Sequence, residues 1–219
     1  MKKIFAFVLT AICVTVFFSN SVWAQNGTIR ELTGEVELKR SGSNAFVRAS
    51  VGDSVSQNTI ISTGFRSTAV VAVGSSLITV RPLTRLTLSE IQSAENAENI
   101  NVNLQTGRVR VEVTPPAGSR TDFSVQSPSS TASVRGTIFE TDGFNYSTVQ
   151  GVIDVKGSGN EPVTMLSAGL STFIDTQGTP VNPFTLSVVQ STIESIQGAR
   201  EIIAVSEVSA DGSIDLNVD

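Results

Sequence analysis

The chain of 219 residues contains no histidine, and its one cysteine (Cys13) and one tryptophan (Trp23) both lie close to the N-terminus. Without histidine there is no Ser-His-Asp or Cys-His nucleophile, and a zinc site built from Cys and His ligands is excluded. A single cysteine forms neither an internal disulfide nor an iron–sulfur cluster. We therefore expect a non-enzymatic protein with no catalytic residues, no cofactor and no metal site.

Aromatic and charged residues are also scarce. Aromatic residues make up 6% of the chain, with Tyr146 the single tyrosine, so few rings are available to stack on sugars. The formal net charge is −5, which makes nucleic acid and anionic lipid poor partners. Hydrophobic residues nevertheless reach 40%, enough for a folded core rather than a disordered chain.

The first 24 residues have the organisation of a secretory signal peptide: two lysines, a mostly apolar run and small residues before a cleavage point. We expect cleavage after Ala24, which leaves 13 basic against 20 acidic residues, a net charge of −7 and no membrane span. One alternative is a membrane anchor, although the apolar run is shorter than the roughly 20 residues that span a bilayer. The other is lipidation at Cys13, where the bulky Ile12 is unfavourable. The predicted location is the periplasm or the extracellular space of a bacterium.

Alternation of polar and apolar residues is the main pattern after the signal peptide. The segment from Arg108 to Val113 alternates strictly, as expected for a strand with one buried face. Similar short runs, separated by glycine-containing turns, begin at Glu35, Leu77, Leu86, Phe123, Ile138 and Val152. Many short strands with regular turns favour an all-β fold, a sandwich or jelly-roll-like body of mostly antiparallel strands. We assign this domain to residues 25–176.

Residues 177–219 have a different character. Asn182 and Pro183 form a typical helix start, and the pattern predicts one amphipathic helix that ends near Gln197. Its apolar face includes Val188, Ile193 and Ile196. A small hairpin is predicted after the helix. This helix either docks on the β-domain or binds a partner.

The segment from Thr131 to Thr141 resembles the FecR-type domain family. Val134, Arg135, Gly136 and Thr137, followed by Phe139, match the most recognisable part of that family, and we call residues 134–139 the signature segment. Other pieces occur in the family's order: Gly34-Glu-Val-Glu-Leu, Gly52-Asp-Ser-Val, Ile61-Ser-Thr-Gly, Pro82-Leu-Thr-Arg-Leu-Thr-Leu, Leu104-Gln-Thr-Gly-Arg-Val-Arg-Val and Gly151-Val-Ile-Asp-Val. The resemblance covers about residues 29–174.

The resemblance implies an exported all-β module. In the best-known members, this module is the periplasmic part of a membrane regulator that relays an iron-uptake signal to a cytoplasmic sigma factor. Here only three residues precede the apolar run, so the chain is similar to stand-alone exported FecR domains. The resemblance alone gives no mechanism.

Three groups of residues are candidate sites. Arg135 either ties strands together from a buried or half-buried position or contacts an anion or a partner. Arg108 and Arg110 form either a basic stripe for a partner or an ordinary solvated face balanced by Glu112. The residues Glu90, Glu95 and Glu98 offer carboxylates for glycoside hydrolysis, but in a polar stretch where solvation opposes a raised pKa.

The leading functional hypothesis is a non-enzymatic signalling module that binds a protein partner in the cell envelope. Its candidate partner-binding residues are Arg108, Arg110, Val188, Ile193 and Ile196. The alternative is a peptidoglycan- or carbohydrate-binding protein or a structural envelope protein. The sequence does not determine the partner, the signal or the oligomeric state.

Overall fold

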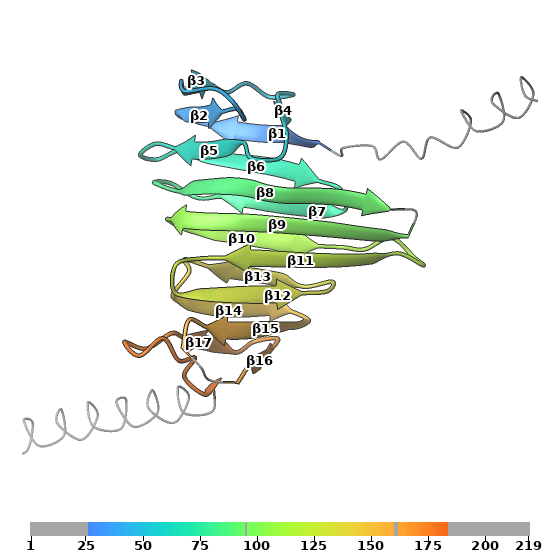
Figure 1. Cartoon of the computed structure of the whole chain (residues 1–219), viewed down its shortest axis with the longest axis vertical. Coiled ribbons are helices and arrows are strands. Elements are labelled where there is room, and N and C mark those ends of the chain that lie inside the picture. Colours follow the sequence, from blue (N-terminus) through green and yellow to red (C-terminus); the bar gives the residue numbers. More distant parts are fainter. Residues whose placement is uncertain (1–25, 95, 160–161, 184–219) are drawn as a thin grey trace, which may run out of the picture.

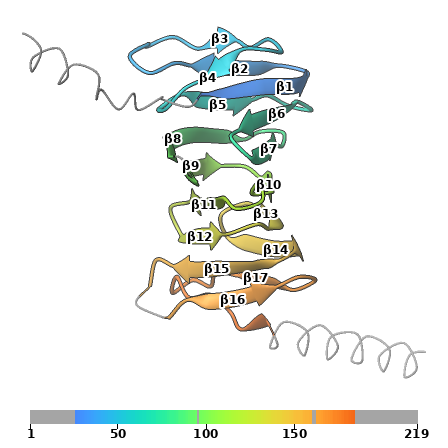
Figure 2. The ribbon, with the colours of Figure 1, turned by 90° about the vertical axis from the view of Figure 1, so that its right-hand side faces the viewer.

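The computed structural model describes residues 26–94, 96–159 and 162–183, and every regular element in these ranges is a β-strand. Two sheets pack face to face as a tall sandwich (Figures 1 and 2). The prediction of an all-β sandwich of short, mostly antiparallel strands is confirmed. The predicted signal peptide and terminal hairpin lie outside the described residues, as does the predicted C-terminal helix after Pro183. None of the described residues belongs to a helix long and apolar enough to cross a bilayer.

The two sheets contain eight and nine strands. Sheet A has the order β17 (Ser171–Phe173), β14 (Asn145–Gln150), β13 (Ile138–Thr141), β10 (Val109–Val113), β7 (Ser76–Val80), β6 (Thr68–Val73), β1 (Gly27–Thr33), β4 (Ser54–Val55). Sheet B has the order β16 (Thr164–Ser167), β15 (Val152–Gly157), β12 (Ser130–Val134), β11 (Arg120–Gln126), β9 (Ala97–Thr106), β8 (Arg85–Ala94), β5 (Ile60–Thr63), β2 (Val36–Lys39), β3 (Val47–Arg48).

Strand order follows the chain along the long axis, as the colour gradient of Figure 1 shows. The chain adds hairpins to the two sheets in turn, for example β6–β7 to sheet A and β8–β9 to sheet B. Because β10 crosses to sheet A between β9 and β11, those two strands are parallel neighbours in sheet B. Segments close in sequence are therefore close in space, and turns from successive hairpins gather at the two ends of the strands.

The core lies between the sheets and follows the predicted alternation. Val109, Val111 and Val113 of β10 are buried, whereas Arg110 and Glu112 between them are half-buried on the outer face. The largest side chains that are fully enclosed include Tyr146, Phe123, Phe139, Ile29, Leu38 and Ile61. A continuous apolar layer of this kind supplies most of the stability of a protein without disulfides.

The end of the described chain packs against the last strand of sheet A. The backbone N–H of Val181 donates to the carbonyl of Phe173 at 2.9 Å, and Ile174 forms an isolated bridge with Pro180. Residues 174–181 therefore cover part of the edge of β17.

Candidate functional site

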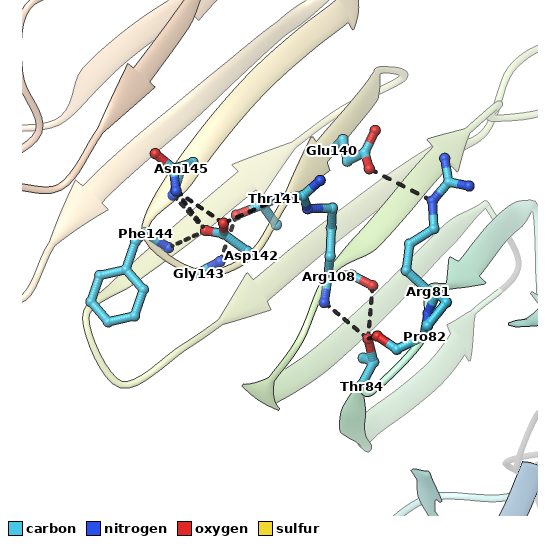
Figure 3. Close-up of polar contacts among 10 residues, drawn as sticks. All are labelled: Arg81, Pro82, Thr84, Arg108, Glu140, Thr141, Asp142, Gly143, Phe144 and Asn145. Carbon is cyan, nitrogen blue, oxygen red and sulfur yellow. Dashed lines mark hydrogen bonds and ion pairs between the residues drawn. The ribbon is translucent and has the colours of Figure 1, made fainter. Parts of the chain in front are cut away.

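Three chain connections meet at one end of the sandwich. They follow β7, β9 and β13 and comprise residues 81–84, 107–108 and 142–144. The N–H of Arg81 donates to the carbonyl of Arg108 at 3.0 Å, and the N–H of Arg108 donates to Oγ1 of Thr84 at 2.9 Å. Oγ1 of Thr84 donates in return to the carbonyl of Arg108 at 3.1 Å. These bonds place Arg81 and Arg108 side by side on neighbouring turns (Figure 3).

Gly107 makes this close approach possible. Its φ of +91° lies in the region that side-chain-bearing residues rarely adopt, and a Cβ there would lie 2.4 Å from Cα of Thr84. Only glycine fits between the two turns. The position of Arg108 is thus fixed by the residue before it.

Each arginine faces a carboxylate at a distance beyond hydrogen-bond range. Nε of Arg81 lies 3.6 Å from Oε1 of Glu140, and Nη2 of Arg108 lies 3.7 Å from Oδ2 of Asp142. Nε of Arg81 is enclosed yet has no hydrogen-bond partner among the described residues. The side chains of Arg81 and Arg108 are 41% and 58% exposed, so the parts of both guanidinium groups that face solvent remain available to another carboxylate.

Asp142 organises the third turn. Its Oδ1 accepts the N–H of Asn145 at 2.7 Å and the N–H of Phe144 at 3.0 Å, and its carboxylate also accepts the Asn145 side-chain amide at 2.9 Å. Burial by itself raises the pKa of Asp142, but these hydrogen bonds and the charge of Arg108 outweigh it, so the pKa lies below the ordinary value of 3.8. The carboxylate is therefore ionised at neutral pH and holds the turn that displays Phe144.

Two large apolar side chains flank the arginines in the open. Leu83 is 60% exposed and Phe144 is 56% exposed. Leu83 has a φ of +56°, a strained conformation for a bulky residue, and its N–H donates to the carbonyl of Gly64 at 3.2 Å. The surrounding hollow of about 730 Å³, which we call the arginine hollow, is lined by Arg81, Pro82, Leu83, Gly107, Arg108, Glu140, Asp142 and Phe144.

A second hollow of about 490 Å³ adjoins the first, because Arg108, Glu140 and Asp142 line both. It extends along β14 and β17, over the buried Tyr146. Burial raises the pKa of Tyr146 above 10.0, despite its 2.6 Å hydrogen bond with Ser130. Tyr146 therefore stays neutral at physiological pH and acts as a packing and hydrogen-bonding group.

The predicted pair Arg108 and Arg110 separates in the structure. Arg108 enters the arginine hollow, whereas Nε of Arg110 binds Oε1 of Glu112 at 3.0 Å on its own strand. The other candidate partner-binding residues, Val188, Ile193 and Ile196, lie outside the described residues. The sequence analysis missed Leu83 and Phe144, although a large apolar residue directly after Pro or Gly in a turn is a signal for them.

The signature segment combines buried and exposed positions. Val134 and Phe139 are buried in the core, and the enclosed Thr137 donates from Oγ1 to the carbonyl of Val152 at 3.1 Å. Gly136 has a φ of +71°. Residues 135–137 connect β12 of sheet B to β13 of sheet A.

Arg135 is exposed rather than buried or half-buried. Its side chain is 68% exposed because it leaves β12 on the outer side of sheet B. Nε of Arg135 donates to Oδ1 of Asp122 at 2.6 Å, and Oδ2 of Asp122 lies 3.5 Å from Nε of Arg120. The arginine thus links β12 to β11 through a carboxylate while most of its guanidinium faces solvent.

Two of the three glutamates considered for hydrolysis have structural partners. Oε2 of Glu90 accepts the side-chain amide of Asn101 at 2.6 Å. Oε2 of Glu98 accepts hydrogen bonds from Ser75 and Thr121 at the opposite end of the sandwich. Glu95 lies outside the described residues. Within the described ranges there is no cluster of three or more carboxylate, imidazole or thiol groups that could hold a metal ion.

Part of this chain matches a known protein family. Residues 59–155, from the start of β5 almost to the end of β15, match the family described as FecR protein. The predicted FecR-type resemblance is thus confirmed for residues 59–155, a shorter range than the predicted residues 29–174. No curated protein matches the chain in sequence.

Two crystal structures of a candidate anti-sigma factor from Parabacteroides distasonis ATCC 8503 match part of this chain. Each has 14% identity and a TM-score of 0.45 and covers 58% of this chain. The match spans 62% of the length of that protein.

Proposed function

We propose that this protein is an exported, non-enzymatic FecR-type module that binds a protein partner in the cell envelope through the arginine hollow. The signal-peptide pattern of residues 1–24 and the FecR match support an envelope location. The binding role rests on one observation. Leu83 and Phe144 are held in the open, by a strained turn and by an Asp142-bonded turn, on either side of two loosely paired arginines.

The chemistry of the hollow defines the kind of partner. Exposed apolar side chains held on ordered turns gain free energy when a second protein covers them. Arg81 and Arg108 keep donors for a carboxylate, because neither makes a hydrogen bond with Glu140 or Asp142. The partner surface therefore presents apolar side chains together with at least one Asp or Glu.

A site-directed cross-linking experiment tests this function. In a Cys13→Ala chain, Pro82→Cys places a thiol at an exposed position in the lining of the hollow, and Thr131→Cys places one on the outer face of sheet B as a control. We expect Pro82→Cys, linked in living cells with a thiol-reactive photo-cross-linker, to capture one envelope protein that Thr131→Cys does not capture. Equal capture by both variants, or capture of no protein by either, contradicts the proposal.

A second arm separates binding from folding. Leu83→Ser with Phe144→Ser removes the apolar contacts, and Arg108→Gln removes one charge. We expect each variant to lower capture about tenfold or more while thermal unfolding stays close to that of the parent chain. The matched control is Val149→Ser, which removes an apolar side chain that is 52% exposed elsewhere on sheet A.

A further inference from the structure

A groove runs across the outer face of sheet B, away from the arginine hollow. Its lining comes from five neighbouring strands, β16, β15, β12, β11 and β9, and its volume is about 650 Å³. At a strand spacing of about 4.8 Å, four spacings make it roughly 19 Å long. We call it the sheet B groove. An extended polymer that crosses the strands fits this shape.

One row of side chains lies along the groove in register. Asp154 is directly opposite Met165 on one side and Ser133 on the other, and Ser124 is opposite both Ser133 and Asn101. The row therefore presents a carboxylate, two hydroxyls and an amide on successive strands. Side chains with this spacing form a regular ladder of hydrogen-bonding groups.

The two halves of the row differ in whether their polar groups already form hydrogen bonds with other side chains. The hydroxyl of Ser124 donates to Oδ1 of Asn101, whose amide donates to Glu90 at 2.6 Å, so this half is internally satisfied. Asp154 and Ser133 have no side-chain hydrogen bond or ion pair with any described residue. We call the half of the groove around Asp154 and Ser133 the open half. Its polar groups are free to bind a ligand.

Further groups beside the open half complete the chemistry. Arg135 uses Nε on Asp122 and turns the rest of its guanidinium to solvent, and the amide of Asn99 has no partner within the described ranges. Met165 is 68% exposed and Val152 is 42% exposed, and both line the same groove. The groove thus offers hydrogen-bond donors, hydrogen-bond acceptors, groups that both donate and accept, and a small apolar surface.

These groups match a chain of neutral sugars better than a peptide or a nucleic acid. Sugar hydroxyls donate to Asp154, accept from Arg135 and do both with Ser133, while ring C–H groups pack on Met165. A peptide that crosses the strands cannot add to the sheet, because the backbone groups of interior strands are already paired. The unpaired carboxylate of Asp154 repels phosphates and uronates.

We propose that the sheet B groove binds a neutral polysaccharide chain. This binding site is separate from the arginine hollow and does not depend on a protein partner. Asp154 is the central acceptor, with Ser133, Asn99 and Arg135 on its flanks and Met165 as the apolar contact.

Calorimetric titration of the purified full chain tests the proposal. The probes are cellohexaose, chitohexaose and, as an acidic counterpart, hexagalacturonate. We expect a neutral hexasaccharide to bind and hexagalacturonate not to bind. Asp154→Ala is expected to weaken binding about tenfold or more, because it removes a hydrogen bond to a charged group. Ser133→Ala is expected to have a smaller effect.

Matched controls lie two residues away on the same strands and the same outer face. Thr131 on β12 and Lys156 on β15 are opposite each other and outside the groove. Thr131→Ala and Lys156→Ala should bind like the parent chain, and all variants should unfold at the same temperature. The proposal is overturned if no neutral hexasaccharide binds, if only hexagalacturonate binds, or if Asp154→Ala binds as tightly as the parent.

Discussion

Oδ1 of Asp142 accepts the backbone N–H of Asn145 at 2.7 Å, and this bond closes the turn that displays Phe144. Asp142→Ala removes this acceptor and leaves two backbone N–H groups without it. Because hydrogen bonds to a partly enclosed charged group contribute about 1.5–3 kcal/mol, we expect the free energy of unfolding to fall by about 1–2 kcal/mol. Urea unfolding followed by circular dichroism measures the change. Asp142→Asn keeps one acceptor oxygen, so its free energy of unfolding should fall by less. An equal fall in both variants would contradict this account.

The same carboxylate makes stability depend on pH. The pKa of Asp142 is lower in the folded chain than the ordinary 3.8, so the folded state favours the ionised form. Its contribution is fully present well above the unfolded pKa and is lost as the pH falls through the folded pKa. We therefore expect the stability difference between the parent and Asp142→Asn to be constant from neutral pH down to about pH 5 and to shrink below about pH 4. A difference that grows on acidification would reverse the assigned direction of the shift.

Substitution of Leu83 should weaken partner binding without lowering the stability of the fold. Its φ of +56° is costly for leucine but not for glycine, and little of its exposed side chain packs on the domain. We expect Leu83→Gly to leave the free energy of unfolding unchanged or to raise it by up to about 1 kcal/mol, while capture of the partner falls. Thermal unfolding and the cross-linking assay measure the two effects. A variant that captures its partner normally would remove Leu83 from the binding surface.

Gly107 lies at the same end of the sandwich as Leu83 and, like Leu83, has a positive φ. Gly107→Ala introduces a Cβ 2.4 Å from Cα of Thr84, at a φ of +91°. Because backbone must move to relieve this contact, we expect a loss of more than about 2 kcal/mol in unfolding free energy. Gly118→Ala is a suitable control, since it shares a positive φ of +80° but has no heavy atom within 4 Å of the added Cβ. It should cost clearly less in the same denaturation measurement.

The strands were predictable because their signal is local. Val109, Val111 and Val113 are buried and Arg110 and Glu112 face outward, as the period of two requires. Arg110 and Glu112 are two residues apart, so the same period places them next to each other on the outer face, where they form an ion pair. By contrast, the parallel pairing of β9 with β11 depends on where β10 goes, and no local pattern encodes it.

The arginine hollow was not predictable, because it unites turns that are distant in sequence. Arg81 and Glu140 are 59 positions apart, and their proximity depends on the order β7–β10–β13 in sheet A. The exposure of Arg135 also differs from the buried or half-buried position in the first of its two interpretations, since a position just after a strand can face either layer. Local periodicity thus determines which face of a strand is buried, whereas strand order determines which turns meet.

The buried face of β10 gives the most direct test of the fold. Val111 is fully buried at the centre of a strand paired on both sides, with Ile78 on β7 and Phe139 on β13. Val111→Asp places a carboxylate in this apolar layer without a partner, so we expect a loss of more than about 4 kcal/mol and a largely unfolded chain. Thr79→Asp is the control, because it adds the same carboxylate on the outer face directly opposite Arg110. Circular dichroism should show the control folded and Val111→Asp unfolded, and a folded Val111→Asp would mean that the inward face of β10 is wrongly assigned.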